Sequence, residues 1–305
     1  MNQSTPRACA EHGHAFNATA HSDVNPEKPG ATFGELARIF VDRRDVKFWQ
    51  AEGPQHNYLY WVRAMLSQEI EPPPLISRIV PSPQNEVEKL RFARAREEVY
   101  GFLGRAFEYP DAALLGDITT ATFVERVAGQ FRQLANNDEV NAGLALWLQA
   151  AERDGALLGD SGLGVLREAY TKIVYDSNLP CIPPYQSVYY NEHHVNGKQA
   201  RTAAACYRTA GLGVENGDMP DHIAIECEFA AFLAGKEAVA WKCDQRAVAQ
   251  QAEETLTDFL REHVVSWGGK FCADLQQLAK VDFYRAVARL GAGLFNDELL
   301  RLSDA

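Results

Sequence analysis

The spacing of apolar residues in the second part of the chain constrains its fold more than any other feature. In the stretch NEVEKLRFARAREEVYGFLGRAF, residues 85–107, apolar side chains recur at the three- and four-residue intervals of an α-helix. Nowhere do apolar and polar residues alternate over a strand's length. We therefore expect an all-α fold: a helical bundle of about eight or nine helices with an N-terminal helical extension. The further stretches with helical spacing are 120–135, 139–154, 162–176, 198–211, 217–235, 243–279 and 281–302.

Proline sets the expected domain boundary. Five of the fourteen residues from Glu71 to Gln84 are proline, which lacks a backbone donor and excludes helix. Before this segment, Thr32-x-x-Glu35 is a capping-box pattern that predicts the start of a helix. We expect a disordered tail over 1–31, a helical extension with a proline-rich linker over 32–84, and an all-α domain over 85–305.

Charge and cysteine usage narrow the class of protein. The net charge of −11 and the pI of about 5.3 argue against a general nucleic-acid binder, and they suit a partner that carries positive charge. None of the six cysteines forms a C-x-x-C pair, which indicates reduced thiols in a cytoplasmic protein. The chain has no apolar run of signal-peptide or bilayer-spanning kind, so no membrane insertion is expected.

The stretch GDMPDHIAIECEFAAFLAG, residues 217–235, first suggests ordinary helix-start chemistry. Pro220 suits a first helical turn, where its missing donor costs nothing. Asp221 in the same turn would meet the positive end of the helix dipole. This interpretation explains Asp221 without any ligand.

His222 and Glu226 in the same stretch allow a sharper hypothesis. Four residues apart, they share one helix face and could ligate a metal or act as acid and base. A metal-dependent enzyme would need a further ligand, for which His193 or His194 is the candidate. Neither a Gly-x-Ser-x-Gly elbow nor a phosphate-cradling loop is present, so no catalytic residue and no nucleotide switch is expected.

A proline-containing loop, LPCIPPYQSVYY, is the second distinctive feature. It combines three prolines with amphipathic aromatic rings in twelve residues, 179–190. It could be a tight crossover between helices with its tyrosines packed beneath. It could equally be a stiff rim that binds a peptide, since rigid aromatic side chains give contact area at low entropic cost.

These two segments resemble the signature segments of the TorD/DmsD family of redox-enzyme maturation chaperones. The family patterns read P-P-x-E-S-V-Y and P-D-H-I-x-x-E-L-x-F, and the two matches stand about thirty residues apart. The likeness extends over about residues 88–302, two-thirds of the chain. The matching residues are Pro183, Pro184, Ser187, Val188 and Tyr189 in the first, Pro220, Asp221, His222, Ile223, Glu226 and Phe229 in the second, and Phe259, His263, Trp267 and Phe271 in a following segment.

The resemblance implies an all-helical cytoplasmic chaperone that is not an enzyme and holds no metal or resident cofactor. Such proteins serve molybdenum oxidoreductases of anaerobic respiration. They bind the twin-arginine signal peptide and often the apo form of the catalytic subunit, and they hold that subunit until its cofactor is inserted and it is exported. The resemblance assigns the peptide-binding role to Asp221, His222, Glu226, Pro184, Tyr185, Gln186 and Tyr189.

Two departures from the family pattern bear on this role. Gln186 stands where the family usually has glutamate, and Cys227 where it usually has leucine. Gln186 keeps an acceptor but loses a charge, which puts in doubt a salt bridge from that position to a cationic partner.

Two mechanisms for the acidic residues remain open from the sequence. Asp221 and Glu226 could accept bidentate hydrogen bonds from guanidinium groups of the peptide. Alternatively, a buried Glu226 would need a partner, and His222 one turn earlier is the nearest, so this pair could be a structural clasp that holds the loop to the helix.

Overall fold

The computed structural model of the protein describes residues 80–153, 161–176, 181–190, 197–214 and 218–303. These residues form eleven α-helices and one π-helical turn, with no strand among them, which confirms the predicted all-α class. The predicted N-terminal tail and helical extension lie outside the described residues. The elements are α3 (Glu86–Phe107), α4 (Ala112–Ile118), α5 (Ala121–Leu134), α6 (Asp138–Arg153), α8 (Gly162–Val174), α9 (Gln186–Tyr189), α10 (Lys198–Thr209), α11 (Ile223–Lys242), α12 (Arg246–Phe259), the π-turn η1 (Leu260–Val264), α13 (Val265–Leu278) and α14 (Asp282–Ser303).

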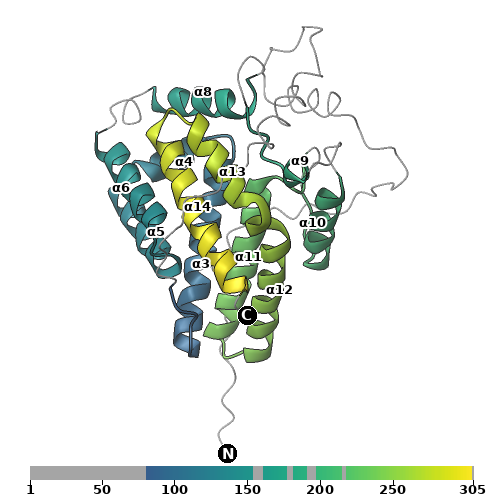
Figure 1. Ribbon diagram of the computed structural model, residues 1–305. Coiled ribbons are helices and arrows are strands. Elements are labelled where there is room, and N and C mark those ends of the chain that lie inside the picture. Colours follow the sequence, from purple (N-terminus) through teal and green to yellow (C-terminus); the bar gives the residue numbers. More distant parts are fainter. Residues whose placement is uncertain (1–79, 154–160, 177–180, 191–196, 215–217, 304–305) are drawn as a thin grey trace, which may run out of the picture.

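Helices α3 and α11 form an antiparallel pair at the centre of the bundle (Figure 1). Helix α3 begins where expected, because the side chain of Asn85 accepts a hydrogen bond from the amide of Glu88 and caps the first turn. Gly104 sets the spacing of the pair: a Cβ there would lie 2.9 Å from Cγ of Glu228 and 3.1 Å from the carbonyl oxygen of Ala224. The missing side chain therefore lets the start of α11 approach the backbone of α3 closely.

Aromatic side chains from distant helices fill the core. Phe102 of α3 stacks on Trp147 of α6 with ring centroids 4.6 Å apart. Phe107 at the end of α3 meets Phe271 of α13 edge to face at 5.3 Å. Burial of each such side chain stabilises the fold by about 1.5–3 kcal/mol, so these contacts hold α3, α6 and α13 together.

A buried ion pair joins the first described helix to the last one. The guanidinium of Arg96 in α3 donates hydrogen bonds of 2.9 and 2.7 Å to the two carboxylate oxygens of Glu298 in α14. Arg301 lies 3.1 Å from the same carboxylate and also donates to the carbonyl oxygen of Val80, at 3.4 Å. The start of the described chain is therefore fastened to the C-terminal helix.

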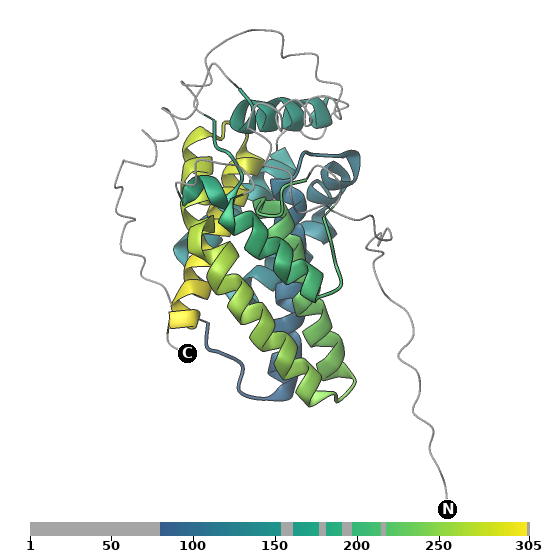
Figure 2. The same ribbon diagram turned by 90° about the vertical axis from the view of Figure 1, so that its right-hand side faces the viewer.

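Two helices lie outside this bundle. Helix α8 crosses one end of it, and α10 packs on the outside of α11 and α12 (Figures 1 and 2). Helix α10 ends at Thr209, and Gly211, just beyond its C-cap, has a φ of +78°, the left-handed conformation that favours glycine and stops a helix. The predicted stop of this helix at Gly211 is confirmed.

Three elements differ from the expectation. Helix α4 was not predicted, and α9 lies within what was expected to be an irregular loop. The continuous helix expected over 243–279 is divided by the π-turn Leu260–Val264 into α12 and α13. A π-turn takes up one extra residue while the apolar spacing continues, so periodicity does not reveal it.

Three of the described cysteines, Cys181, Cys227 and Cys272, are free and buried. Within the described part of the chain, no helix is both long and apolar enough to cross a bilayer.

Candidate functional site

The structure brings the proline loop and the start of α11 into direct contact. The amide of Gln186 donates to the carbonyl oxygen of Asp221, and the amide of Ile223 donates to that of Pro184, both at 2.9 Å. These two bonds form an isolated antiparallel bridge between segments more than thirty residues apart in the sequence. The two motifs are therefore one structural unit.

Asp221 caps the short helix α9 rather than its own helix. Its Oδ2 accepts a hydrogen bond of 2.9 Å from the amide of Ser187, and its side chain is fully buried. The spacing had placed Pro220 and Asp221 in the first turn of α11, but that helix begins at Ile223. The N-cap residue of α9, Tyr185, makes no side-chain cap bond, so Asp221 supplies the cap from a distance.

His222 is the N-cap of α11. Its Nδ1 accepts a hydrogen bond of 3.1 Å from the amide of Ala224, so this ring nitrogen carries no proton. Its ring meets that of Tyr185 edge to face at 5.3 Å. The hypothesis that His222 is the partner of Glu226 is wrong, because the hydrogen-bond donor to Glu226 is Trp267 of α13.

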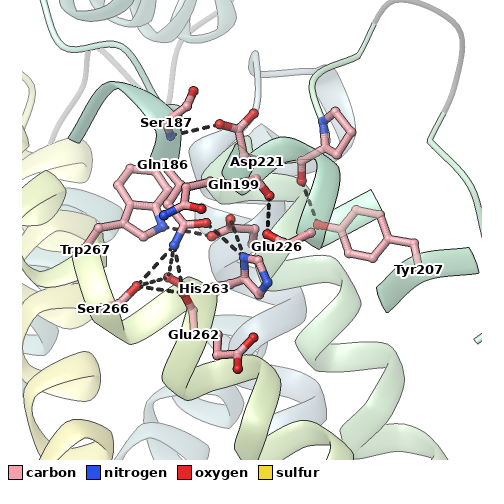
Figure 3. A network of polar contacts seen from close by, with 12 residues as sticks. Gln186, Ser187, Gln199, Tyr207, Asp221, Glu226, Glu262, His263, Ser266 and Trp267 are labelled. Atoms are coloured by element: carbon pink, nitrogen blue, oxygen red, sulfur yellow. Dashed lines mark hydrogen bonds and ion pairs between the residues drawn. The ribbon is translucent and has the colours of Figure 1, made fainter. Parts of the chain in front are cut away.

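Glu226 is a fully buried carboxyl group at the centre of a polar network (Figure 3). Its Oε2 accepts a hydrogen bond of 2.9 Å from Nε1 of Trp267, and its Oε1 lies 3.7 Å from Nδ1 of His263. Burial raises the pKa of Glu226 well above its usual value; the bond from Trp267 offsets part of this effect, and the charge of Asp221 adds to it. Burial therefore favours the protonated, neutral form of Glu226.

Gln186 connects α9 to the π-turn. Its Oε1 accepts a hydrogen bond from Nδ1 of His263, 2.9 Å away. Its Nε2 donates to the carbonyl oxygen of Glu262 at 2.8 Å and to Oγ of Ser266 at 3.2 Å. The wide turn leaves carbonyl oxygens without their usual helical partner, and the amide satisfies them. Burial lowers the pKa of His263 to about 4, so its ring is uncharged at neutral pH.

Tyrosines of α9 form the accessible edge of this unit. Tyr189 is half-buried; its hydroxyl donates to Oδ2 of Asp274 at 3.1 Å, and its ring packs on Trp267 and Phe271 at centroid distances of 5.0 and 6.4 Å. Tyr190, the next residue, is 44% exposed. An aromatic surface therefore stands next to the buried network.

Acidic residues gather beside the same helix start. Burial, together with the charges of Glu108 and Asp218, raises the pKa of Glu228 to about 7. Glu228 lies on α11 two residues beyond Glu226, so the two side chains point to different sides of the helix. Sequence reasoning did not single out Glu228, because its acidic neighbours come from the end of α3 and the loop before α11.

His263 and Trp267 complete the unit, although neither was predicted as a site residue. The ring of His263 stacks on Phe259 at 4.8 Å, and Trp267 supplies the bond to Glu226. Their match to the third family segment was the available signal. The match did not show that this third segment contacts the proline loop and the start of α11.

The alternative of a metal-dependent enzyme finds no support in the described geometry. No group of three or more His, Cys, Asp or Glu among the described residues is placed to hold a metal ion. Nδ1 of His222 and Oε2 of Glu226 are already engaged, with Ala224 and Trp267. His193 and His194, the candidate further ligands, lie outside the described residues.

A comparison with known protein families matches a stretch of this chain that contains all three segments. Residues 134–273 match the model of the nitrate reductase delta subunit family. The chaperone protein TorD of Vibrio cholerae serotype O1, Classical Ogawa, is 30% identical over 117 residues, 38% of this chain and 52% of the relative. The El Tor Inaba counterpart is 29% identical over the same shares of both chains. The chain thus spans about half the length of the curated relatives it matches, and no solved structure matches it.

Proposed function

We propose that this chain is a cytoplasmic chaperone for a molybdenum oxidoreductase and a member of the TorD/DmsD chaperone family. The family model and the curated relatives support this proposal. It binds the twin-arginine signal peptide, the apo catalytic subunit, or both, and holds the subunit until cofactor insertion and export. One observation carries this proposal: three segments distant in sequence form one unit with a buried hydrogen-bond network and an aromatic edge (Figure 3).

Within this unit we assign two kinds of role. Asp221, His222, Glu226 and Gln186 are buried and hydrogen-bonded, so they hold the shape of the peptide-binding segment. Pro184 and Tyr185 are buried beneath it and fix its backbone. Tyr189 reaches the surface and contacts the apolar stretch of the peptide, since rigid aromatic rings contribute most to peptide affinity.

The cationic part of the peptide is recognised by the acidic group around Glu228. A guanidinium favours the ionised form of a carboxyl group whose pKa burial has raised, and it donates a pair of hydrogen bonds to the two oxygens of that carboxylate. The net charge of −11 adds long-range attraction for a cationic peptide. The basic part of a twin-arginine peptide is thus matched by the acidic group around Glu228, and its apolar part is matched by the aromatic surface at Tyr189.

The test is titration calorimetry with the twin-arginine signal peptide of the molybdoenzyme encoded beside this gene. Tyr189→Ala and Glu228→Gln should each weaken binding by about three- to tenfold, because each removes a direct contact. Glu254→Gln, an exposed carboxylate on α12, is the matched control and should bind like the wild type. The wild-type affinity should fall as salt rises.

A double variant examines the buried residues. Asp221→Ala/His222→Ala removes the caps of α9 and α11, and it should weaken binding while the far-ultraviolet dichroism of the bundle is retained. Wild-type protein that binds neither the signal peptide nor the apo subunit would refute the proposal. A metal bound at one equivalent by purified protein would revive the enzyme alternative.

A further inference from the structure

Helix α10 has two faces of opposite character. Its buried face is apolar and packs against the bundle, and its outward face is basic. Together these make it an amphipathic helix whose polar side is all of one charge sign. The buried residues, at helical spacing, are Ala200, Ala203 and Tyr207; the exposed cations, which we call the basic face of α10, are Lys198, Arg201 and Arg208.

The basic charge of α10 is opposite in sign to the net charge of the whole chain, which is acidic. The chain has 41 acidic residues, yet residues 193–214 contain none. Among the described residues, neither Lys198 nor Arg208 has an ion pair. Other helices pair exposed cations with acids of the same helix: Lys172 with Glu168, Arg261 with Asp258, and Arg285 with Asp282. The exposed cations Lys198 and Arg208 therefore lack the acidic partner on their own helix that these other cations have.

Helix stability does not account for Lys198. A cation in the first turn meets the positive end of the helix dipole, which is mildly unfavourable. Lys198 is the first residue of α10, whose N-cap, Gly197, makes no side-chain cap bond. A carboxylate would serve this position better, so the lysine has another use.

The basic face is held in a fixed position relative to the peptide-binding unit. The hydroxyl of Tyr207 donates a hydrogen bond of 2.7 Å to the carbonyl oxygen of Pro220, next to Asp221 (Figure 3). The ring of Tyr207 packs against Phe229 of α11 at 4.7 Å and Phe259 of α12 at 6.0 Å. The helix therefore presents its cations from a rigid support beside the second motif.

We infer that the basic face of α10 binds an acidic segment in the body of the client subunit, separately from the signal peptide. This inference rests on the proposed function and adds a second contact to it. A twin-arginine peptide is cationic and is repelled by α10, so charge sorts the two parts of the client between two surfaces. Two weak contacts on one rigid body then raise the affinity for the whole client.

The experiment measures two affinities for each variant. The probes are the signal peptide alone and the apo catalytic subunit of the same molybdoenzyme produced without its signal peptide. Lys198→Glu/Arg208→Glu reverses the basic face, and Lys198→Glu by itself favours the helix, so a loss of binding cannot come from fraying of its first turn. Arg132→Glu/Lys242→Glu makes the same charge change at exposed sites on α5 and α11.

The inference predicts that reversal of the basic face weakens binding of the signal-less subunit by about tenfold while binding of the signal peptide is unchanged or tighter. The control variant should match the wild type. Equal losses in both variants, or no loss in either, would overturn the inference. So would failure of the wild type to bind the signal-less subunit, even if the signal peptide binds and the proposed function stands. A change of oligomeric state on reversal would assign the face to a second copy of the chain instead.

Discussion

Glu226 shows how a single residue can be misjudged from its charge. In the sequence it is an acid one turn from a histidine, which suggests an ion pair or an anion for a cationic ligand. In the structure it is a buried carboxyl group that accepts a hydrogen bond from Trp267, and burial raises its pKa and so favours its neutral form. Its burial could be anticipated from the helical pattern, but its partner comes from another helix, and spacing within one helix cannot identify it.

Glu226→Gln should therefore leave the free energy of unfolding unchanged or higher at pH 7, because the amide keeps an acceptor for Trp267. Since the pKa of Glu226 is higher in the folded than in the unfolded chain, the unfolded chain releases this proton first as pH rises above the ordinary pKa of a glutamate. The wild type should thus lose stability relative to Glu226→Gln by at most about 1.4 kcal/mol per pH unit. Urea unfolding at several pH values measures this difference, and parallel curves would contradict it.

Glu228 carries a prediction about binding. Its pKa of about 7 means that the carboxyl group becomes ionised between pH 6 and pH 8. A cationic signal peptide binds the ionised form better, so affinity should rise over this range and fall again at high salt. Calorimetry at both pH values checks this. Glu228→Gln should remove most of the pH dependence, and an equal dependence in that variant would assign it to other groups.

At the scale of elements, most helices were predictable, but α4, α9 and the π-turn were not. Seven described helices, α3, α5, α6, α8, α10, α11 and α14, fall in stretches with clear helical spacing, since their buried faces repeat within one element. Helix α9 has four residues after a run of prolines, and its stability depends on Asp221, which lies 34 residues from Ser187. No local pattern contains that information.

Asp221→Ala should consequently affect α9 before the rest of the molecule. Loss of the distant cap should cost about 1 kcal/mol and speed amide hydrogen exchange at Ser187, whereas Asp221→Asn keeps an acceptor and should restore most of the protection. Hydrogen exchange resolved by residue gives the answer. Equal exchange at Ser187 in wild type and Asp221→Ala would show that α9 does not depend on this cap.

At the scale of the whole molecule, the periodicity of apolar residues predicted the fold class. It did not predict which helices contact one another across the bundle. Arg96 and Glu298 are 202 residues apart and completely engaged with each other. A sequence read alone would place an arginine and a glutamate on solvated helix faces. The same limit applied to the candidate site: Trp267 of α13 was matched to a family segment, but the sequence did not show that it contacts the other two segments.

Arg96→Leu should destabilise the protein by about 3–5 kcal/mol, because it leaves Glu298 with one cation fewer in a buried position. Arg96 lowers the pKa of Glu298 against the effect of burial, so the loss should shrink at acid pH, where Glu298 can take up a proton. The double variant Arg96→Leu/Glu298→Leu should be less destabilised than Arg96→Leu. Thermal unfolding of the three proteins measures this order, and the reverse order would contradict it.

The π-turn has a consequence for the history of this chain. One residue more than an α-helix needs is held between Leu260 and Val264, and the carbonyl oxygens it releases are met by the amide of Gln186. Deleting that residue would take the carbonyl oxygen of Glu262 away from the amide of Gln186. A carboxylate at 186 would keep the bond from Nδ1 of His263, but its second oxygen would face the carbonyl oxygen of Glu262 instead of a donor. The extra residue and the glutamine should therefore have been inherited together, and an alignment of close homologues should show both present or both absent.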